Sequence, residues 1–251
     1  ERVAGKVRFS PVLVDQYAEA SLFKSIPKIV LMSATLTNAS LSALGIKPVD
    51  ADWITLPSPF PVARRPVSVY IDRVFPLRID MRMTPEIASE WLHQIDTFLG
   101  ARADRKGLIP TISYARQDYL VQHSKHSARM IVPEKASDLP NAIRRFRAAP
   151  ASSGAILVSP AIAEGFDFPY EDAEYIAVIK LPFPDTRSPI VKARLKRNPE
   201  YRDAVTMRTL VQMVGRAMRA KDDRCDVVIF DEHARWFLKK RRAFAPKWFL
   251  D

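Results

Sequence analysis

The feature that most constrains the fold is a regular alternation of short apolar runs with segments of helical periodicity. The strongest apolar runs are residues 155–159, 175–181 and 227–230. Weaker runs lie at residues 67–71, 108–113 and 129–132, and the predicted helices between the runs are residues 84–99, 117–123 and 139–148. Continuous apolar strands that alternate with helices are typical of a parallel sheet with helices on both faces. The sequence therefore predicts an α/β fold.

Charge and cysteine content narrow the class of protein. The chain has 39 basic against 28 acidic residues, a net charge of +11 that favours a polyanionic partner such as nucleic acid. Its single cysteine, Cys225, rules out an intramolecular disulfide and fits a reducing compartment. We see no apolar run long enough for a membrane span and no signal peptide, and we expect a cytoplasmic protein with no membrane partner. Because the chain begins at Glu1 rather than at methionine, we expect a fragment.

Residues 203–220 have helical periodicity and carry the most specific motif. Gln212, Arg216 and Arg219 share one stripe of this predicted helix. A second stripe, roughly 130° away, is the predicted core face, and it consists of Met207, Val211, Val214 and Met218.

Two arginines and an amide therefore project together from an anchored helix. Arginine presents a rigid fork of donors that suits phosphate oxygens, and Gly215 leaves room for a close approach to the backbone. The alternative is a solvated basic helix face. The complete pattern, Q-x-x-G-R-x-x-R, resembles motif VI of superfamily 2 helicases.

Residues 28–32 are predicted to form a buried strand, which Ser33-Ala34-Thr35-Leu36 follows directly. Small hydroxyl residues at the carboxyl end of a strand can present polar groups at the edge of an α/β sheet, although a simple turn is the alternative. The segment resembles helicase motif III (L-x-S-A-T-L), which couples the nucleotide site to the nucleic-acid groove. A helix is predicted to start at residues 38–41.

Two further motifs follow predicted strands. The first motif lies at the end of the run 108–113 and contains Ser113, Tyr114 and Arg116. It resembles motif IV, where a serine and a tyrosine can contact a nucleic-acid backbone and a base. The alternative is a tyrosine that covers the sheet edge, and Pro110 is unfavourable inside a strand.

The other motif follows residues 155–159. It resembles motif V (E-G-x-D-F/L) and contains Ser159, Glu164, Gly165 and Asp167. A carboxylate at this place can bind a ribose or orient an arginine, and its alternative is a turn or helix-cap residue.

In their order and spacing these motifs, with S-P-F at residues 58–60 and K-L-P-F-P at residues 180–184, resemble the XPD/DinG group of superfamily 2 DNA helicases. The resemblance covers roughly residues 22–232. It implies a RecA-like, P-loop NTPase-like fold, with two RecA-like domains that clamp ATP and Mg²⁺ while single-stranded DNA crosses both, usually in 5′ to 3′ translocation. It places Arg216 and Arg219 at the ATP phosphates with Gln212 positioning them, Asp167 at the ribose, and Glu164 and Gly165 between ATP and DNA.

Prolines cluster between residues 48 and 66, which indicates an extended connector and a domain boundary. We assign residues 1–56 to the tail of the first RecA-like domain and residues 57–251 to the second. The chain has no G-x-x-x-x-G-K-[ST] phosphate loop. We therefore expect the phosphate cradle, the Mg²⁺ ligands and any iron–sulfur cluster outside this chain, no metal site within it, and no ATP hydrolysis by the fragment alone.

Asp231 and Glu232 follow the apolar run 227–230 and imitate a Walker B strand end. Because they come after the motif VI-like segment, we interpret them as a structural strand end with a capping carboxylate. Two alternatives to a helicase motor remain open. One is a nucleic-acid-binding or partner-docking module with a degenerate helicase fold, and the other is an unrelated basic α/β enzyme.

Overall fold

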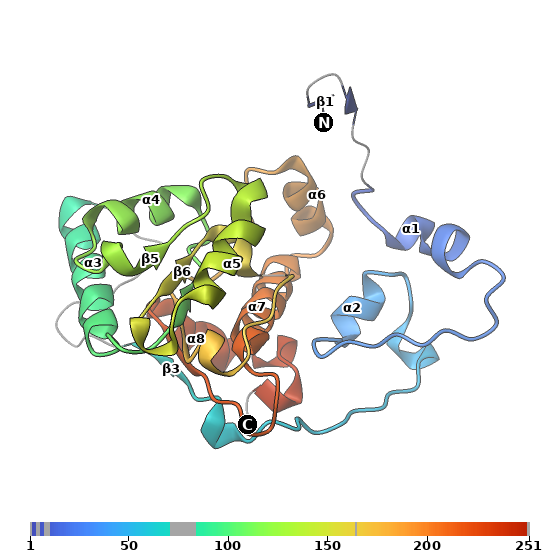
Figure 1. The fold of residues 1–251 in the computed structure, drawn as a ribbon. Helices are drawn as coiled ribbons and strands as arrows, with labels where there is room; N and C mark the ends of the chain where they lie inside the picture. The colour runs from blue at the N-terminus through green and yellow to red at the C-terminus, as the bar shows by residue number, and fades with distance from the viewer. Residues whose placement is uncertain (1, 4–5, 8–10, 71–83, 164, 250–251) are drawn as a thin grey trace. The chain divides into compact units, whose positions relative to one another are not determined.

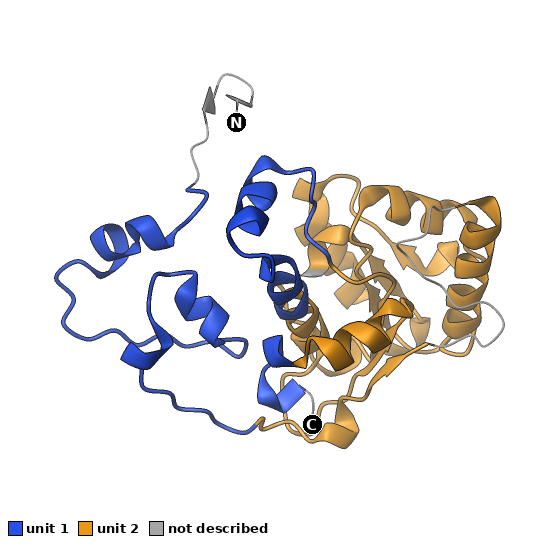
Figure 2. Cartoon of the chain, turned by 180° about the vertical axis from the view of Figure 1, so that it is seen from behind, with its two compact units in different colours: residues 1–57, 183–208, 243–250 blue, residues 58–182, 209–242, 251 orange. Residues whose placement is uncertain are grey.

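The computed structural model describes all residues except 1, 4–5, 8–10, 71–83, 164 and 250–251. The chain divides into two compact units (Figure 2). The first unit contains residues 1–57, 183–208 and 243–250, and the second contains residues 58–182, 209–242 and 251. The assignment of residues 1–56 to the tail of another RecA-like domain stays a prediction.

A six-stranded sheet forms the centre of the second unit (Figure 1), and all its strand pairs are parallel. In spatial order the strands are β3 (Val67–Val69), β8 (Asp226–Ile229), β7 (Tyr175–Val178), β4 (Gly107–Ile109), β6 (Ile156–Val158) and β5 (Met130–Ile131). Every residue of β4, β6 and β7 is buried. This confirms the predicted α/β fold with a parallel sheet.

Helices alternate with these strands, as the periodicity predicts. Those of the second unit are α3 (Pro85–Gly100), α4 (Tyr114–His123), α5 (Leu139–Ala148) and α8 (His233–Lys240), while α7 (Tyr201–Val214) begins in the first unit and ends in the second. The N-terminus of α3 shows how neighbouring residues determine where a helix starts. The Thr84 hydroxyl accepts a hydrogen bond from Ile87 N at 3.4 Å, and Pro85 occupies the first turn, where its missing N–H costs nothing.

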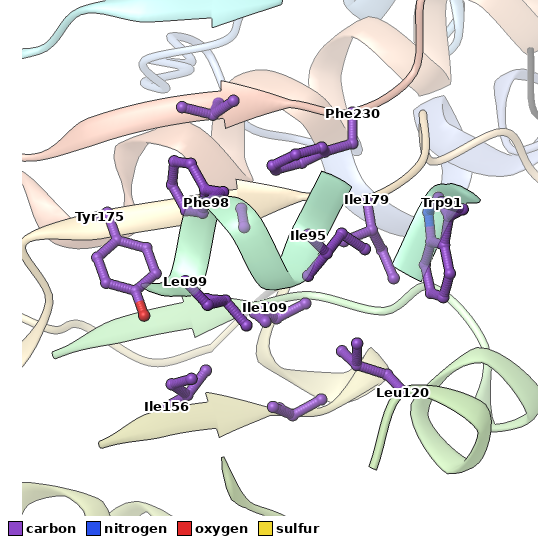
Figure 3. Close-up of a cluster of buried hydrophobic side chains, with 13 residues drawn as sticks. Trp91, Ile95, Phe98, Leu99, Ile109, Leu120, Ile156, Tyr175, Ile179 and Phe230 are labelled. Carbon is purple, nitrogen blue, oxygen red and sulfur yellow. The ribbon is translucent and has the colours of Figure 1, made fainter. Parts of the chain in front are cut away.

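The core of the second unit lies between α3 and the sheet, as Figure 3 shows. Phe98 meets the rings of Tyr175 and Phe230 edge-on, with centroid distances of 5.4 and 5.3 Å. Gly107 at the start of β4 makes this packing possible, because a Cβ there would lie 2.2 Å from the Tyr175 ring. The buried core residues of α3 are Trp91, Ile95, Phe98 and Leu99.

The first unit has little regular structure among its described residues. It contains a two-stranded antiparallel pair, β1 (Arg2–Val3) with β2 (Lys6–Val7), a short α1 (Asp15–Ala18) that continues as a π-helical turn (Glu19–Phe23), α2 (Asn38–Ser42) and α6 (Pro189–Arg197). The predicted helix start at residues 38–41 is confirmed, and Thr37 and Ser40 form a capping box there.

The predicted strand at residues 28–32 is wrong. These residues have no regular structure, and Val30 and Met32 are 91% and 95% exposed. A parallel strand exists only where neighbouring strands supply its hydrogen bonds, and the described strands of the first unit, β1 and β2, pair with each other.

The other predicted strands are present, but with bounds that differ from the prediction; the predicted strand 175–181, for example, ends at Val178. The predicted strand 108–113 ends at Ile109, because Pro110 has no N–H to donate to the ladder. The predicted strand 67–71 ends at Val69, although Tyr70 N still donates to Ile229 O at 2.8 Å, and residue 71 lies outside the described residues.

The strand order places a switch point between β4 and β7. From β4 the chain continues to β5 and β6 on one side of the sheet, whereas from β7 it continues to β8 on the other side. The carboxyl ends of the strands meet at one edge of a parallel sheet, and crevices for ligands form where the connections diverge. The motif-bearing segments after β4 and β6 therefore lie at this edge.

Candidate functional site

Arg216 and Arg219 converge on the carboxylate of Asp167. Arg219 Nη2 pairs with Asp167 Oδ1, and Arg216 Nη1 lies 3.9 Å from the same oxygen. Arg216 Nη1 also donates to the main-chain oxygen of Phe166 at 3.1 Å, which anchors this guanidinium. The exposed fractions of the side chains are 58% for Asp167, 37% for Arg219 and 15% for Arg216. We call these three residues the arginine–aspartate cluster; it is open to solvent on the Asp167 side.

The cluster forms although the predicted helix over residues 203–220 ends early. Helix α7 ends at Val214, Gly215–Ala217 is a 3-10 turn, and Met218 is extended with φ −114° and ψ 107°. Glycine is a weak helix former, and Arg216 O accepts the Phe168 N–H at 3.0 Å instead of continuing the helix. The two arginines therefore lie together at Asp167, but not on one helix face as predicted.

The other stripe of the predicted helix is confirmed as a core face, because all four of its residues are buried: Met207, Val211, Val214 and Met218. Gln212 lies in the last turn of α7 and is half-buried. The arginine–aspartate cluster thus extends from a well-anchored helix end.

The segment after β6 carries Asp167 and is held by α5. Gly165 has φ +89°, a left-handed conformation that suits glycine, and it is exposed. Glu164 lies outside the described residues. Arg147 of α5 donates through Nη2 to Asp167 O at 2.6 Å and through Nε to Asp172 Oδ2 at 3.1 Å. Arg147 is not among the site residues that the sequence predicts.

Ser159 begins the same segment, directly after β6. Its side chain is fully buried, and its hydroxyl accepts a hydrogen bond from Ala161 N at 3.1 Å. In this conformation the side chain is not accessible to a nucleic acid.

The residues predicted to contact nucleic acid after β4 begin helix α4. The Ser113 hydroxyl accepts from Arg116 N at 3.4 Å and caps this helix, while Tyr114 is exposed. Ile112 has φ +65°, a strained value for a β-branched residue, and this directs the chain out of the sheet. Arg116 is half-buried, and burial lowers the pKa of its guanidinium from the usual value.

Ser33 and Thr35 belong to the first unit. Ser33 Oγ accepts from Thr35 N at 3.1 Å and lies 3.2 Å from Thr35 Oγ1, while Trp248 Nε1 donates to Ala34 O at 2.9 Å. The segment is thus an ordered turn, although the strand predicted before it is absent.

Asp231 has the structural role expected of it. Its Oδ1 accepts from His233 N at 3.1 Å, at the start of α8, and its Oδ2 accepts from Leu181 N at 3.1 Å. Among the residues that the structure describes, no group of three or more His, Cys, Asp or Glu side chains is placed to hold a metal ion. Within the same part of the chain, no helix is long and apolar enough to cross a membrane.

Several known proteins are similar to this chain in sequence or in fold. The Saccharomyces cerevisiae protein "General transcription and DNA repair factor IIH helicase subunit XPD/RAD3" is 31% identical over 136 residues, which cover 49% of this chain and 17% of that protein. The Schizosaccharomyces pombe protein "General transcription and DNA repair factor IIH helicase subunit XPD" is 31% identical over 119 residues, covering 43% of this chain and 15% of that protein. The chain therefore matches only a small part of the length of these relatives.

A solved structure described as "XPD_Helicase" superposes with a TM-score of 0.63 at 18% identity, covering 92% of this chain and 44% of that chain, which supports the fold alone. The family model described as "Helicase C-terminal domain" matches residues 103–250, more than half of the 251 residues. This chain therefore belongs to the helicase C-terminal domain family, in the form found in XPD/Rad3-family helicases.

Proposed function

We propose that this chain is the second motor domain of an ATP-dependent DNA helicase, in which the arginine–aspartate cluster completes an ATP site built mainly by another domain of the same protein. The observation that carries the proposal is the convergence of Arg216 and Arg219 on the exposed Asp167. Two guanidinium groups at one solvent-accessible point can neutralise phosphate charge, which is the main requirement of phosphoryl transfer.

The side chains of the cluster fit a nucleotide. The guanidinium of Arg219 is held by a carboxylate, and a phosphate oxygen can replace that acceptor because arginine binds both groups through the same donors. Asp167, once released, can accept hydrogen bonds from a ribose. Gln212 positions the arginines from the end of α7. Mg²⁺, held by the other domain, would neutralise further phosphate charge.

Domain closure can couple the arginine–aspartate cluster to movement of the protein. An arginine that reaches the phosphates only when two domains close makes hydrolysis depend on domain motion. In this proposal Ser33 and Thr35 couple the nucleotide site to the DNA groove, and Glu164 and Gly165 lie between the two sites. The partners are therefore the first RecA-like domain and single-stranded DNA.

The exposed Tyr114 can stack on a base, and Ser113 and Arg116 lie beside it at the switch point of the sheet. The 5′ to 3′ direction and a role in DNA repair rest on the family resemblance, whereas a cytoplasmic location rests on sequence features such as the single cysteine.

The test compares ATP hydrolysis by the full-length protein with and without single-stranded DNA. We expect stimulation by DNA and a loss of about a hundredfold or more in kcat for Arg219→Ala, because arginines that stabilise the transferred phosphate contribute at least this much in other enzymes. Arg187→Ala is the matched control, because Arg187 is an exposed arginine that pairs with Asp185. It should hydrolyse ATP at the wild-type rate.

Wild-type activity in Arg219→Ala would remove Arg219 from the site. A wild-type protein that binds single-stranded DNA but hydrolyses no ATP would favour the nucleic-acid-binding module.

A further inference from the structure

Asp223 is a buried carboxylate that lies four residues beyond Arg219 and has no part in the site as described so far. Only 1% of its surface is exposed. Its Oδ1 accepts hydrogen bonds from Tyr170 N at 3.1 Å and from Arg224 N at 2.8 Å, and its Oδ2 accepts from Arg219 N at 3.1 Å. These three charge-assisted hydrogen bonds to main-chain N–H groups hold the connected segments firmly together, and we call this arrangement the Asp223 joint.

The two outer partners of this joint belong to the two segments that form the arginine–aspartate cluster. Tyr170 lies three residues beyond Asp167, and the Arg219 N–H is the main-chain donor of the residue that carries the guanidinium. Tyr170 has φ +51°, an unfavourable left-handed value that needs support from its surroundings. One carboxylate therefore fixes the Asp167 segment against the Arg219 segment.

The neighbouring Asp222 shows what an ordinary contact at this place looks like. Its side chain is exposed, and its Oδ1 accepts a hydrogen bond from the Tyr170 hydroxyl at 3.1 Å, which raises the pKa of that phenol. This contact joins two exposed side chains, whereas the Asp223 carboxylate binds main-chain N–H groups. Asp222 is thus a matched control for Asp223 in charge, size and position.

We propose that Asp223 is a positioning residue for ATP hydrolysis. It holds the main chain of Arg219 beside the Asp167 segment, so that the guanidinium reaches the phosphates in the transition state, and it does not touch ATP itself. The inference rests on the proposed function of Arg219. Because an asparagine keeps the size of the side chain but turns one acceptor into a donor, Asp223→Asn breaks one side of the joint and leaves an unpaired main-chain N–H.

The experiment is a double-mutant cycle in the full-length protein, with Asp223→Asn, Arg219→Ala and the pair. We expect Asp223→Asn to lower kcat about tenfold or more with a much smaller change in the KM for ATP, since small misplacements of catalytic groups are costly. Combined with Arg219→Ala, it should cause little further loss, because a residue that acts through Arg219 has nothing left to position. Asp222→Asn should keep the wild-type kcat.

Several outcomes would overturn the inference. They are wild-type kcat in Asp223→Asn, a loss that adds in full to that of Arg219→Ala, or an equal loss in Asp222→Asn. Binding of single-stranded DNA without nucleotide should stay at the wild-type Kd, which shows that the variant is folded.

If Asp223→Asn does not fold, Asp223→Ser is used, since the shorter hydroxyl cannot span both segments. Wild-type kcat in that variant would refute the role. A failure of Arg219→Ala to lose activity refutes the proposed function instead, so the two failures are distinct.

Discussion

Asp167 and Asp231 both follow parallel strands at the carboxyl edge of one sheet, yet their surroundings are opposite. Asp231 is 2% exposed, and both of its oxygens accept main-chain N–H groups, from Leu181 and His233. Asp167 has a side chain that is 58% exposed, and its partners are the guanidinium groups of Arg216 and Arg219.

The difference separates a structural carboxylate from one that can serve a ligand. Main-chain donors cannot move away from Asp231 unless the chain unfolds locally, so the carboxylate of Asp231 is not available to a ligand. Long arginine side chains can exchange one acceptor for another, so the partners of Asp167 remain available to phosphate. If the order of the motifs is ignored, the sequence alone suggests the reverse, a catalytic Asp231 and a structural Asp167, because Asp231-Glu232 imitates the end of a Walker B strand.

The largest effect should come from Asp231→Ala. It leaves the buried Leu181 N–H and the partly buried His233 N–H without their acceptor, at about 1–3 kcal/mol for a fully buried group, which corresponds to a Tm lower by roughly 5 °C or more. Thermal unfolding checks this, with the exposed Asp104→Ala as control. A shift no larger than that of the control would contradict the structural role of Asp231.

Asp167→Ala should have the opposite profile. We expect kcat/KM for ATP to fall about tenfold, through the loss of a charge-assisted hydrogen bond of roughly 1.5 kcal/mol, while Tm stays within about 1–2 °C of wild type. Steady-state kinetics and thermal unfolding of the same preparation give both values. A variant that loses stability but hydrolyses ATP normally when folded would show that Asp167 serves the fold and not the ATP site.

A smaller effect is expected for Arg147→Ala. Arg147 holds the main chain of Asp167 without facing the cluster, so its loss should lower kcat/KM for ATP by about two- to fivefold, on the order of 0.5–1 kcal/mol. Arg144→Ala on the same helix is the control, since Arg144 donates to Asn141 nearby. Equal activity of the two variants would show that α5 does not support the Asp167 segment.

The smallest effect concerns pH. Burial raises the pKa of the Asp231 carboxyl above its ordinary value of 3.8. The folded state thus binds this proton more tightly than the unfolded chain, so the contribution to stability is present at low pH and is lost as pH rises through the folded pKa. The Tm difference between wild type and the non-titrating Asp231→Asn should change in favour of the variant as pH rises above 3.8. A change in favour of wild type would contradict the burial argument.

Sequence patterns predicted the elements whose start, end or buried face depends on residues near one another in the chain. Helix α5 has the predicted bounds, Thr84-Pro85 starts α3 as expected, and the predicted core face within residues 203–220 is buried. The strand at residues 28–32 failed because its apolar run carries no information on whether neighbouring strands are present.

The convergence of Arg216 and Arg219 was predicted, but the geometry that produces it was not. Arg216 and Arg219 lie together because of a 3-10 turn and the Asp167 segment rather than one helix face. The roles of Arg147 and Asp223 depend on contacts across 20 and 53 positions of the chain, for which no sequence pattern gave a signal.

The most direct test of the central claim is a structure of the full-length protein with a non-hydrolysable ATP analogue, Mg²⁺ and single-stranded DNA. We expect the guanidinium groups of Arg216 and Arg219 to lie at hydrogen-bond distance, about 2.7–3.2 Å, from phosphate oxygens. We also expect the pair between Arg219 and Asp167 to be broken in that structure. A bound nucleotide with Arg219 still paired to Asp167 and both arginines away from the phosphates would contradict the claim.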